Sequence, residues 1–305
     1  MRRNVLLYVF CVLTWGSTWF AIDFQLGVVA PVASLVYRYF LAAVILFFYC
    51  RYRRIDLHFP LQRHLQFAGM GVLLFGLNYL LTYAAQLYIS SALNAIAFST
   101  MLIMNIINTR WFFGTRIGGN VVVGAICGIS GIAILFAPDL MASGGLSHSG
   151  VGLGLCLGGT VVASFGNMLS KSLQDSGVSV ISANTWGMGY GTGFLLTWGL
   201  VSGQPFGFDP SWSYAVSLLY LAIFGSVLAF GAYLTLLGRI GPHRAGYAVV
   251  MFPVIALLFS TLFQGFQVTL SSIFGLGLVL GGNVLVLATR RNLRTIRGLL
   301  HRRWA

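Results

Sequence analysis

The chain has 305 residues, of which 58% are apolar and only 8% are charged, and its net charge is +13. Soluble domains carry roughly a quarter charged residues, so this composition excludes a soluble core and indicates a membrane protein. The positive charge does not indicate a nucleic-acid partner, because no basic stretch accompanies a base-stacking or groove-reading module.

Ten apolar segments follow one another along the chain. Each is close to the length of about twenty residues that a helix needs to cross a bilayer. Because backbone polar groups in lipid must be satisfied within the segment, we expect all ten to be transmembrane helices. They cover 4–22, 31–50, 65–88, 91–113, 118–137, 150–170, 179–201, 213–237, 243–263 and 269–289.

The basic residues alternate between the gaps that separate these segments. Seventeen of the eighteen lie at the two ends of the chain or in or directly beside every second gap, and Arg38 is the exception. The other gaps, at about 23–30, 89–90, 138–149, 202–212 and 264–268, contain no Lys or Arg. Cytoplasmic loops collect Lys and Arg, so the pattern predicts a multi-pass protein of a bacterial inner membrane with both termini in the cytoplasm.

The two ends of the chain have features of their own. A cleaved signal peptide over residues 1–21 is an alternative to the first span, but the apolar run is long for one and polar residues interrupt it. The tail at 290–305 is basic and has apolar residues at helical spacing, which predicts an amphipathic helix on anionic membrane lipids. Its apolar residues are Leu293, Ile296, Leu300 and Trp304.

Nothing in the sequence indicates catalysis. The four cysteines lie within or at the ends of apolar segments without metal-ligand spacing, and the five histidines fall in the gaps or the tail. There is no HExxH motif, no P-loop and no dinucleotide fingerprint, since none of the glycines follows a soluble strand. We therefore expect no enzyme activity, no cofactor and no metal site.

A weak internal repeat relates the two halves at an offset of about 150 residues. Five spans per half is an odd number, so the second copy enters the membrane from the other side, which is an inverted repeat suited to alternating access. The predicted units are 1–137, 150–289 and the tail 290–305. Glycines at corresponding places predict close helix contacts: Gly124 and Gly128 in one half, Gly277 and Gly281 in the other.

Short motifs in this order resemble the drug/metabolite transporter superfamily, EamA-like branch. They lie at Thr14–Ala21, Arg38–Ala43, Tyr83–Ala92, Ala245–Val254 and Gly275–Asn283. The resemblance implies ten spans, with spans 1, 3, 4, 6, 8 and 9 lining the path and spans 5 and 10 outside it. The chain departs from the family at Gly114-Thr115-Arg116, where Gly-Glu-Arg is common, and it contains no Glu.

Aromatic and polar residues recur at helical spacing within several segments and predict a central pocket for a small solute. The candidates are Trp15, Trp19, Asn78, Tyr79, Thr82, Tyr83, Phe98, Met101, Trp186, Tyr190, Tyr247 and Met251. The alternative is that such groups only hold helices together or belong to interfacial belts. For Asn105, Asn108 and Asn283 we expect this structural role.

Three further residues are predicted to act as gates or hinges. Arg38 inside the second segment costs about 2.5–3.5 kcal/mol on insertion scales, so it needs a partner, and Asp23 is the nearest candidate. A contact with a substrate carboxylate, or a latch at the outer gate, is the alternative for Arg38. Pro253 removes one helical hydrogen bond and should bend the ninth segment.

These features together predict a transporter or exporter of small metabolites. By resemblance and from the aromatic residues, we expect the solutes to be amino acids, above all aromatic or large apolar ones. We expect them to move by facilitated diffusion or exchange, because no Asp, Glu or His lies deep in a segment. A sugar phosphate or nucleotide-linked sugar is the alternative solute, although it would require two deep cations.

Two alternatives to transport are also open. A non-transporting scaffold would not require the polar faces in both halves. An intramembrane enzyme would require a deep catalytic group that the segments lack. The sequence leaves the oligomeric state open, a homodimer included.

Overall fold

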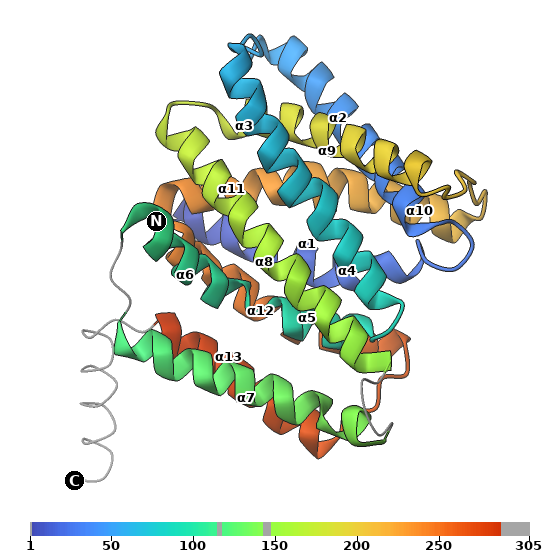
Figure 1. Cartoon of the computed structure of the whole chain (residues 1–305), viewed down its shortest axis with the longest axis vertical. Coiled ribbons are helices and arrows are strands. Elements are labelled where there is room, and N and C mark those ends of the chain that lie inside the picture. The colour runs from blue at the N-terminus through green and yellow to red at the C-terminus, as the bar shows by residue number, and fades with distance from the viewer. Residues whose placement is uncertain (1, 115–117, 143–147, 288–305) are drawn as a thin grey trace.

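The computed structural model describes residues 2–114, 118–142 and 148–287, and every element within these ranges is a helix (Figure 1). The predicted all-helical fold is thereby confirmed for this part of the chain, while the tail at 290–305 lies outside the described residues. The elements are α1 (Arg2–Asp23), α2 (Pro31–Arg53), α3 (Leu61–Gly71), η1 (Val72–Leu77), α4 (Asn78–Gln86), α5 (Ser91–Phe98), α6 (Met101–Phe113), α7 (Gly119–Ala142), α8 (His148–Asp175), α9 (Val180–Val201), α10 (Trp212–Tyr220), η2 (Leu221–Leu228), α11 (Ala229–Ile240), α12 (Pro242–Phe263) and α13 (Leu270–Leu287).

Several helices continue directly into their neighbours, so the described residues form ten helical rods in the places of the ten predicted segments. The third rod is α3, η1 and α4, the fourth is α5 and α6, and the eighth is α10, η2 and α11. By length and composition, six described stretches could cross a membrane: Asn4–Asp23, Pro31–Arg53, Leu61–Gln86, Ser91–Phe113, His148–Asp175 and Trp212–Ile240. Shorter apolar stretches cover Gly119–Leu135, Met251–Phe263 and Leu270–Leu285.

Local signals in the sequence set where several helices begin. The Ser90 hydroxyl accepts a hydrogen bond from the Leu93 N–H at 3.3 Å, and Ser179 caps α9 by accepting from the Ser182 N–H at 3.0 Å. Pro31 stands in the first turn of α2, where a missing N–H removes no helical hydrogen bond. The apolar faces of the helices then determine how the rods pack.

The packing of the rods has a two-fold pattern. The first rod packs against the eighth and ninth, and in the same way the sixth packs against the third and fourth. The second packs against the seventh, and the fifth packs against the tenth. Exchanging each of the first five rods for the rod five places later leaves these contacts unchanged. Figure 1 shows the fifth and tenth rods, α7 and α13, side by side along one edge of the molecule.

Three rods depart from regular α-helix, and two of the departures match between the halves. η1 and η2 are π-helical turns at corresponding places in the third and eighth rods. The fourth rod is broken at Ser99 and Thr100, whose hydroxyls donate to the carbonyls of Ile96 and Ala97 at 2.7 and 2.8 Å. The ninth rod, α12, instead stays helical through Pro253. The two halves therefore differ at this place.

The contact between α7 and α13 brings the two backbones together at glycines. A Cβ atom at Gly282 would lie 2.5 Å from the carbonyl oxygen of Gly124 and 2.8 Å from the amide nitrogen of Gly128. Gly277 and Gly281 have no atom within 4 Å of such a Cβ, so they do not make the predicted close contact. The first-half glycines lie in the interface as predicted, whereas in α13 the facing residue is one position further along the helix.

Candidate functional site

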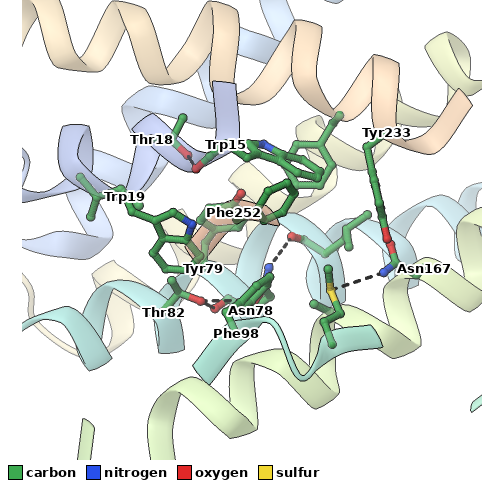
Figure 2. A pocket seen from close by; sticks show the side chains of 15 residues that line it. Trp15, Thr18, Trp19, Asn78, Tyr79, Thr82, Phe98, Asn167, Tyr233 and Phe252 are labelled. Carbon is green, nitrogen blue, oxygen red and sulfur yellow. Dashed lines mark hydrogen bonds between the residues drawn. The ribbon is translucent and has the colours of Figure 1, made fainter. Parts of the chain in front are cut away.

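A pocket inside the bundle leaves about 40 Å³ for the centres of water-sized molecules (Figure 2). At roughly 10–15 Å³ for each water, this is room for only a few water molecules, so the pocket is narrow in this conformation. Rods 1, 3, 4, 6, 8 and 9 form its wall, and none of its 15 lining residues is charged. They are Trp15, Thr18, Trp19, Ile22, Leu74, Asn78, Tyr79, Thr82, Phe98, Met101, Ala163, Asn167, Phe230, Tyr233 and Phe252.

Trp15 anchors the aromatic wall of this pocket. Its indole N–H donates to the carbonyl of Gly225 at 2.9 Å. Gly225 belongs to the π-helical turn η2, where backbone bonds run from i to i+5 instead of i to i+4. The Trp15 ring meets Phe230 at a centroid distance of 4.8 Å and Phe252 at 5.4 Å, both edge to face. The Trp15 side chain of α1 therefore packs against both α11 and α12 at the pocket.

Seven of the twelve predicted binding residues line this pocket, because their helical spacing places them on inward faces of α1, α4 and the fourth rod. Trp19 packs edge to face on Phe98 at 5.4 Å, and Tyr79 lies 6.1 Å from Phe230 between ring centroids. The seven are Trp15, Trp19, Asn78, Tyr79, Thr82, Phe98 and Met101.

The polar residues of α4 in the pocket wall form hydrogen bonds within their own rod. The Thr82 hydroxyl donates to the Asn78 carbonyl at 2.9 Å, and the Asn78 amide donates to the Leu74 carbonyl at 3.3 Å. These bonds satisfy groups that would otherwise be costly to bury. Asn78 and Thr82 therefore present a mildly polar surface to the pocket.

The remaining predicted residues lie elsewhere. The Trp186 indole donates to the Leu57 carbonyl at 3.1 Å, and the Tyr190 hydroxyl lies 3.1 Å from Nδ1 of His64, so both face the loop before α3 and its first turns. Met251 is exposed on α12, and Tyr83 lies outside the pocket wall. The side chain of Tyr247 is outside the described part of the structure.

Asn167 of α8 and Tyr233 of α11 line the pocket but were not predicted to do so. A signal existed for Asn167, since Thr160, Ser164 and Asn167 recur at helical spacing in an otherwise apolar segment. Tyr233 is a single polar residue in an apolar run, for which spacing carries no information. Figure 2 shows the two side chains meeting at one end of the pocket.

Arg38 is almost fully buried in α2, and the predicted pairing with Asp23 is wrong. Its Nε donates to the Ser226 hydroxyl at 2.9 Å and its Nη1 to the Tyr83 hydroxyl at 3.2 Å. The guanidinium lies 4.7 Å from the ring centroid of Tyr79. Among the described residues no carboxylate forms an ion pair with it. Hydroxyl groups and aromatic rings therefore replace the carboxylate, and the Tyr79 ring separates the charge from the pocket.

Asp23, at the end of α1, is held by two glutamines from other rods. Nε2 of Gln86 in α4 and Nε2 of Gln264 after α12 each donate to one of its carboxylate oxygens. Gln86 also donates to the Trp19 carbonyl at 2.9 Å, and the Ser91 hydroxyl donates to Gln264 at 2.6 Å. This hydrogen-bonded cluster joins the first, third, fourth and ninth rods beside the pocket, one turn beyond Trp19.

The ionic groups that the structure describes elsewhere do not contribute to the pocket. Lys171 pairs with Asp175 one turn along α8, and His58 pairs with Asp56 in the loop before α3. Within the described ranges, no three His, Cys, Asp or Glu side chains lie close enough to hold a metal ion. The chemistry available at the pocket is hydrogen bonding and apolar contact.

Comparisons with known proteins give one family match, several relatives and one shared fold. The sequence model of the EamA-like transporter family matches residues 2–137 and 150–288. The uncharacterized transporter YoaV of Bacillus subtilis is 27% identical over 92% of this chain and 96% of its own length. The uncharacterized inner membrane transporter YedA of Escherichia coli K12 is 26% identical over 94% of this chain and 92% of its own length. One solved crystal structure has the same fold at 16% identity, with a TM-score of 0.72 over 95% of this chain and 98% of the other.

Proposed function

The chain belongs to the EamA-like transporter family, and we propose that it exports amino acids with aromatic or large apolar side chains. The observation that carries this proposal is the central pocket, whose uncharged wall is assembled by six rods from both halves. Two halves with matching contacts could rock about such a pocket and open it to either side in turn. Transport then proceeds by alternating access, as facilitated diffusion or exchange.

The chemistry of the pocket wall supports this class of solute over a sugar phosphate and over a scaffold role. Trp15, Trp19 and Phe252 offer aromatic contact for an apolar side chain, and Asn167 offers an amide for a polar group. A sugar phosphate would need cations in the wall, and the one buried arginine that the structure describes lies behind Tyr79. A membrane scaffold would have no use for polar and aromatic side chains from six rods that line one internal pocket.

The proposed topology has ten spans with both termini in the cytoplasm of a bacterial inner membrane. The alternation of basic gaps supports the orientation, and the description of YedA as an inner membrane transporter supports the location. In this orientation the cluster around Asp23 lies toward the outer face. It joins four rods there, so we propose that it closes the outer end of the pocket, with Pro253 as a hinge in α12.

Counterflow in proteoliposomes tests the proposed function. The parent protein, with unlabelled solute inside, should accumulate labelled Phe, Trp, Met or Leu in preference to sugars. Trp15→Ala and Tyr79→Ala should reduce this accumulation to the level of empty liposomes, because each removes a large part of the pocket wall. Trp198→Ala is a matched control, since Trp198 is half exposed on the outer surface of α9 and should be dispensable. Absence of counterflow for every amino acid would contradict the proposal.

Coupling to protons is tested at Asp23, a carboxylate that lies one helical turn beyond Trp19 of the pocket wall. Its carboxylate accepts hydrogen bonds from Gln86 and Gln264 and does not line the pocket. We therefore expect Asp23→Asn to leave the dependence of flux on pH unchanged. The measurement is initial counterflow of labelled phenylalanine between pH 5.5 and 8 for both chains. A pH dependence in the parent that disappears in Asp23→Asn would show proton coupling through this residue.

A further inference from the structure

Three buried polar atoms, two on residues that line one end of the pocket and one on a residue behind it, have no hydrogen-bond partner within normal distance among the described residues. They are the hydroxyl of Tyr233, Oδ1 of Asn167 and Nδ2 of Asn105. The exposed fractions of these residues are 1%, 1% and 0%. Buried polar groups in proteins are nearly always paired, because an unpaired one loses its hydration without compensation. The two atoms that belong to the pocket wall therefore indicate a place for a polar ligand.

The free atoms of Asn167 and Tyr233 belong to two residues of the pocket wall whose side chains meet at this end (Figure 2). Nδ2 of Asn167 donates to Oδ1 of Asn105 at 3.3 Å and to the sulfur of Met101 at 3.6 Å, which leaves the Asn167 carbonyl oxygen as its free acceptor. The Tyr233 ring packs at 5.0 Å from the Trp15 ring, and its hydroxyl reaches the same end as Asn167 (Figure 2). Asn167 and Tyr233 both line the pocket, whereas Asn105 lies behind them and orients Asn167.

We propose that Asn167 and Tyr233 form the binding site for the head group of an α-amino acid, a role that rests on the proposed function. The Asn167 oxygen accepts a hydrogen bond from the ammonium group, and the Tyr233 hydroxyl donates one to the carboxylate. The solute side chain then extends between Trp15, Trp19 and Phe98.

Neutral partners suit a zwitterion better than a singly charged solute. The pocket wall carries no charge, so a solute with a net charge would lose hydration without an ionic partner. In a zwitterion the two opposite charges lie next to each other and offset this loss. Phenylalanine should therefore compete for transport much better than 2-phenylethylamine, which lacks the carboxylate, or 3-phenylpropionate, which lacks the ammonium.

The test combines two variants with these three solutes. Tyr233→Phe removes only the donor to the carboxylate, and it should raise the half-saturation concentration for phenylalanine about tenfold or more, the usual effect of one hydrogen bond to a charged group. It should barely change competition by 2-phenylethylamine, so the preference for phenylalanine over this amine shrinks. Asn167→Leu should in the same way shrink the preference for phenylalanine over 3-phenylpropionate.

Two matched controls separate this role from a general effect of losing a buried polar group. Tyr39 and Asn184 are also buried and also have an unpartnered oxygen among the described residues, but neither lines the pocket. Tyr39→Phe and Asn184→Leu should keep the parent's half-saturation concentration and its preferences. Each preference is a ratio between solutes on one preparation, so it does not depend on how much variant protein folds.

The outcomes distinguish this site from the proposed function. If the parent transports phenylalanine and both pocket variants keep its half-saturation concentration and both preferences, the head-group site is overturned and the transporter stands. If the parent transports no amino acid, the proposed function itself fails. Loss of the two preferences, each in its own variant, supports the assignment of ammonium to Asn167 and carboxylate to Tyr233.

Discussion

A Gly282→Val chain is expected to lose the close packing of α13 against α7 and to unfold at a markedly lower temperature than the parent. The added Cβ would lie 2.5 Å from a backbone carbonyl oxygen and 2.8 Å from a backbone nitrogen of α7, and backbone cannot move aside as a flexible side chain can. Overpacking usually costs about 1–3 kcal/mol, and we expect at least this much here. The measurement is the Tm in detergent, read as the monodisperse fraction that survives heating.

Gly281→Val is the matched control for this prediction. It adds the same side chain at the neighbouring position of the same helix, so the change in helix propensity is alike. No atom lies within 4 Å of its Cβ, and Gly281 is exposed. We expect its Tm to stay near that of the parent. Equal Tm values for the two variants would contradict the observed register between α7 and α13.

Arg38→Met is expected to lower transport by about tenfold or more while the protein stays folded. Arg38 holds Ser226 of η2 and Tyr83 of α4, and its guanidinium supports the ring of Tyr79 that forms the pocket wall. A desolvated cation–π contact contributes about 2 kcal/mol, which corresponds to more than tenfold if Tyr79 loses its place. Burying a charge is itself costly, so the apolar replacement should change the Tm little. Counterflow and Tm, measured on the same preparation, test both statements.

Two further variants define the role of Arg38 as a positioning residue. Arg38→Lys keeps the charge but cannot donate in two directions from a planar group, so it should restore transport in part. Arg63→Met is the control at a less buried arginine of α3, which bonds to Gln66, and it should transport normally. If Arg38→Met transports as well as the parent, the Arg38 contact is not needed to place Tyr79.

The residues that line the pocket could be predicted from the sequence where helical spacing alone places them on one face of a helix. Trp15 and Trp19 lie one turn apart on α1, and Asn78 and Thr82 lie one turn apart on α4, so each pair shares a face. A polar or aromatic face in an apolar segment is expected to turn away from lipid. Tyr233 could not be found in this way, because a lone tyrosine has no spacing from which its direction can be inferred.

Trp186 and Tyr190 show why equal spacing does not ensure equal placement. They lie one turn apart like the tryptophans of α1, yet they face α3, where Tyr190 meets His64. The rotation of α9 about its own axis follows from its close contact with α3. A Cβ at Gly191 would lie 2.9 Å from the Gly71 carbonyl oxygen, so the two backbones approach each other at these glycines. The small residues that face each other set this rotation, and a single segment does not contain that information.

The charged residues show the same division between local and long-range information. Opposite charge predicts that Arg38 pairs with Asp23. In the structure Arg38 turns to the hydroxyl of Ser226, while Asp23 accepts from Gln86 and Gln264. Many neutral polar residues can replace an ionic partner in a bundle, so charge alone does not identify the contact.

The sequence by itself determined the helical rods and the family motifs, because hydropathy, helical period and capping are properties of neighbouring residues. It also determined which faces of α1 and α4 carry the groups of the pocket. Only the tertiary structure decided that Asn167 and Tyr233 join that pocket and that Gly282 faces α7 in place of Gly281. These outcomes depend on the rotation and axial register of each rod, which arise from packing against rods distant in the chain.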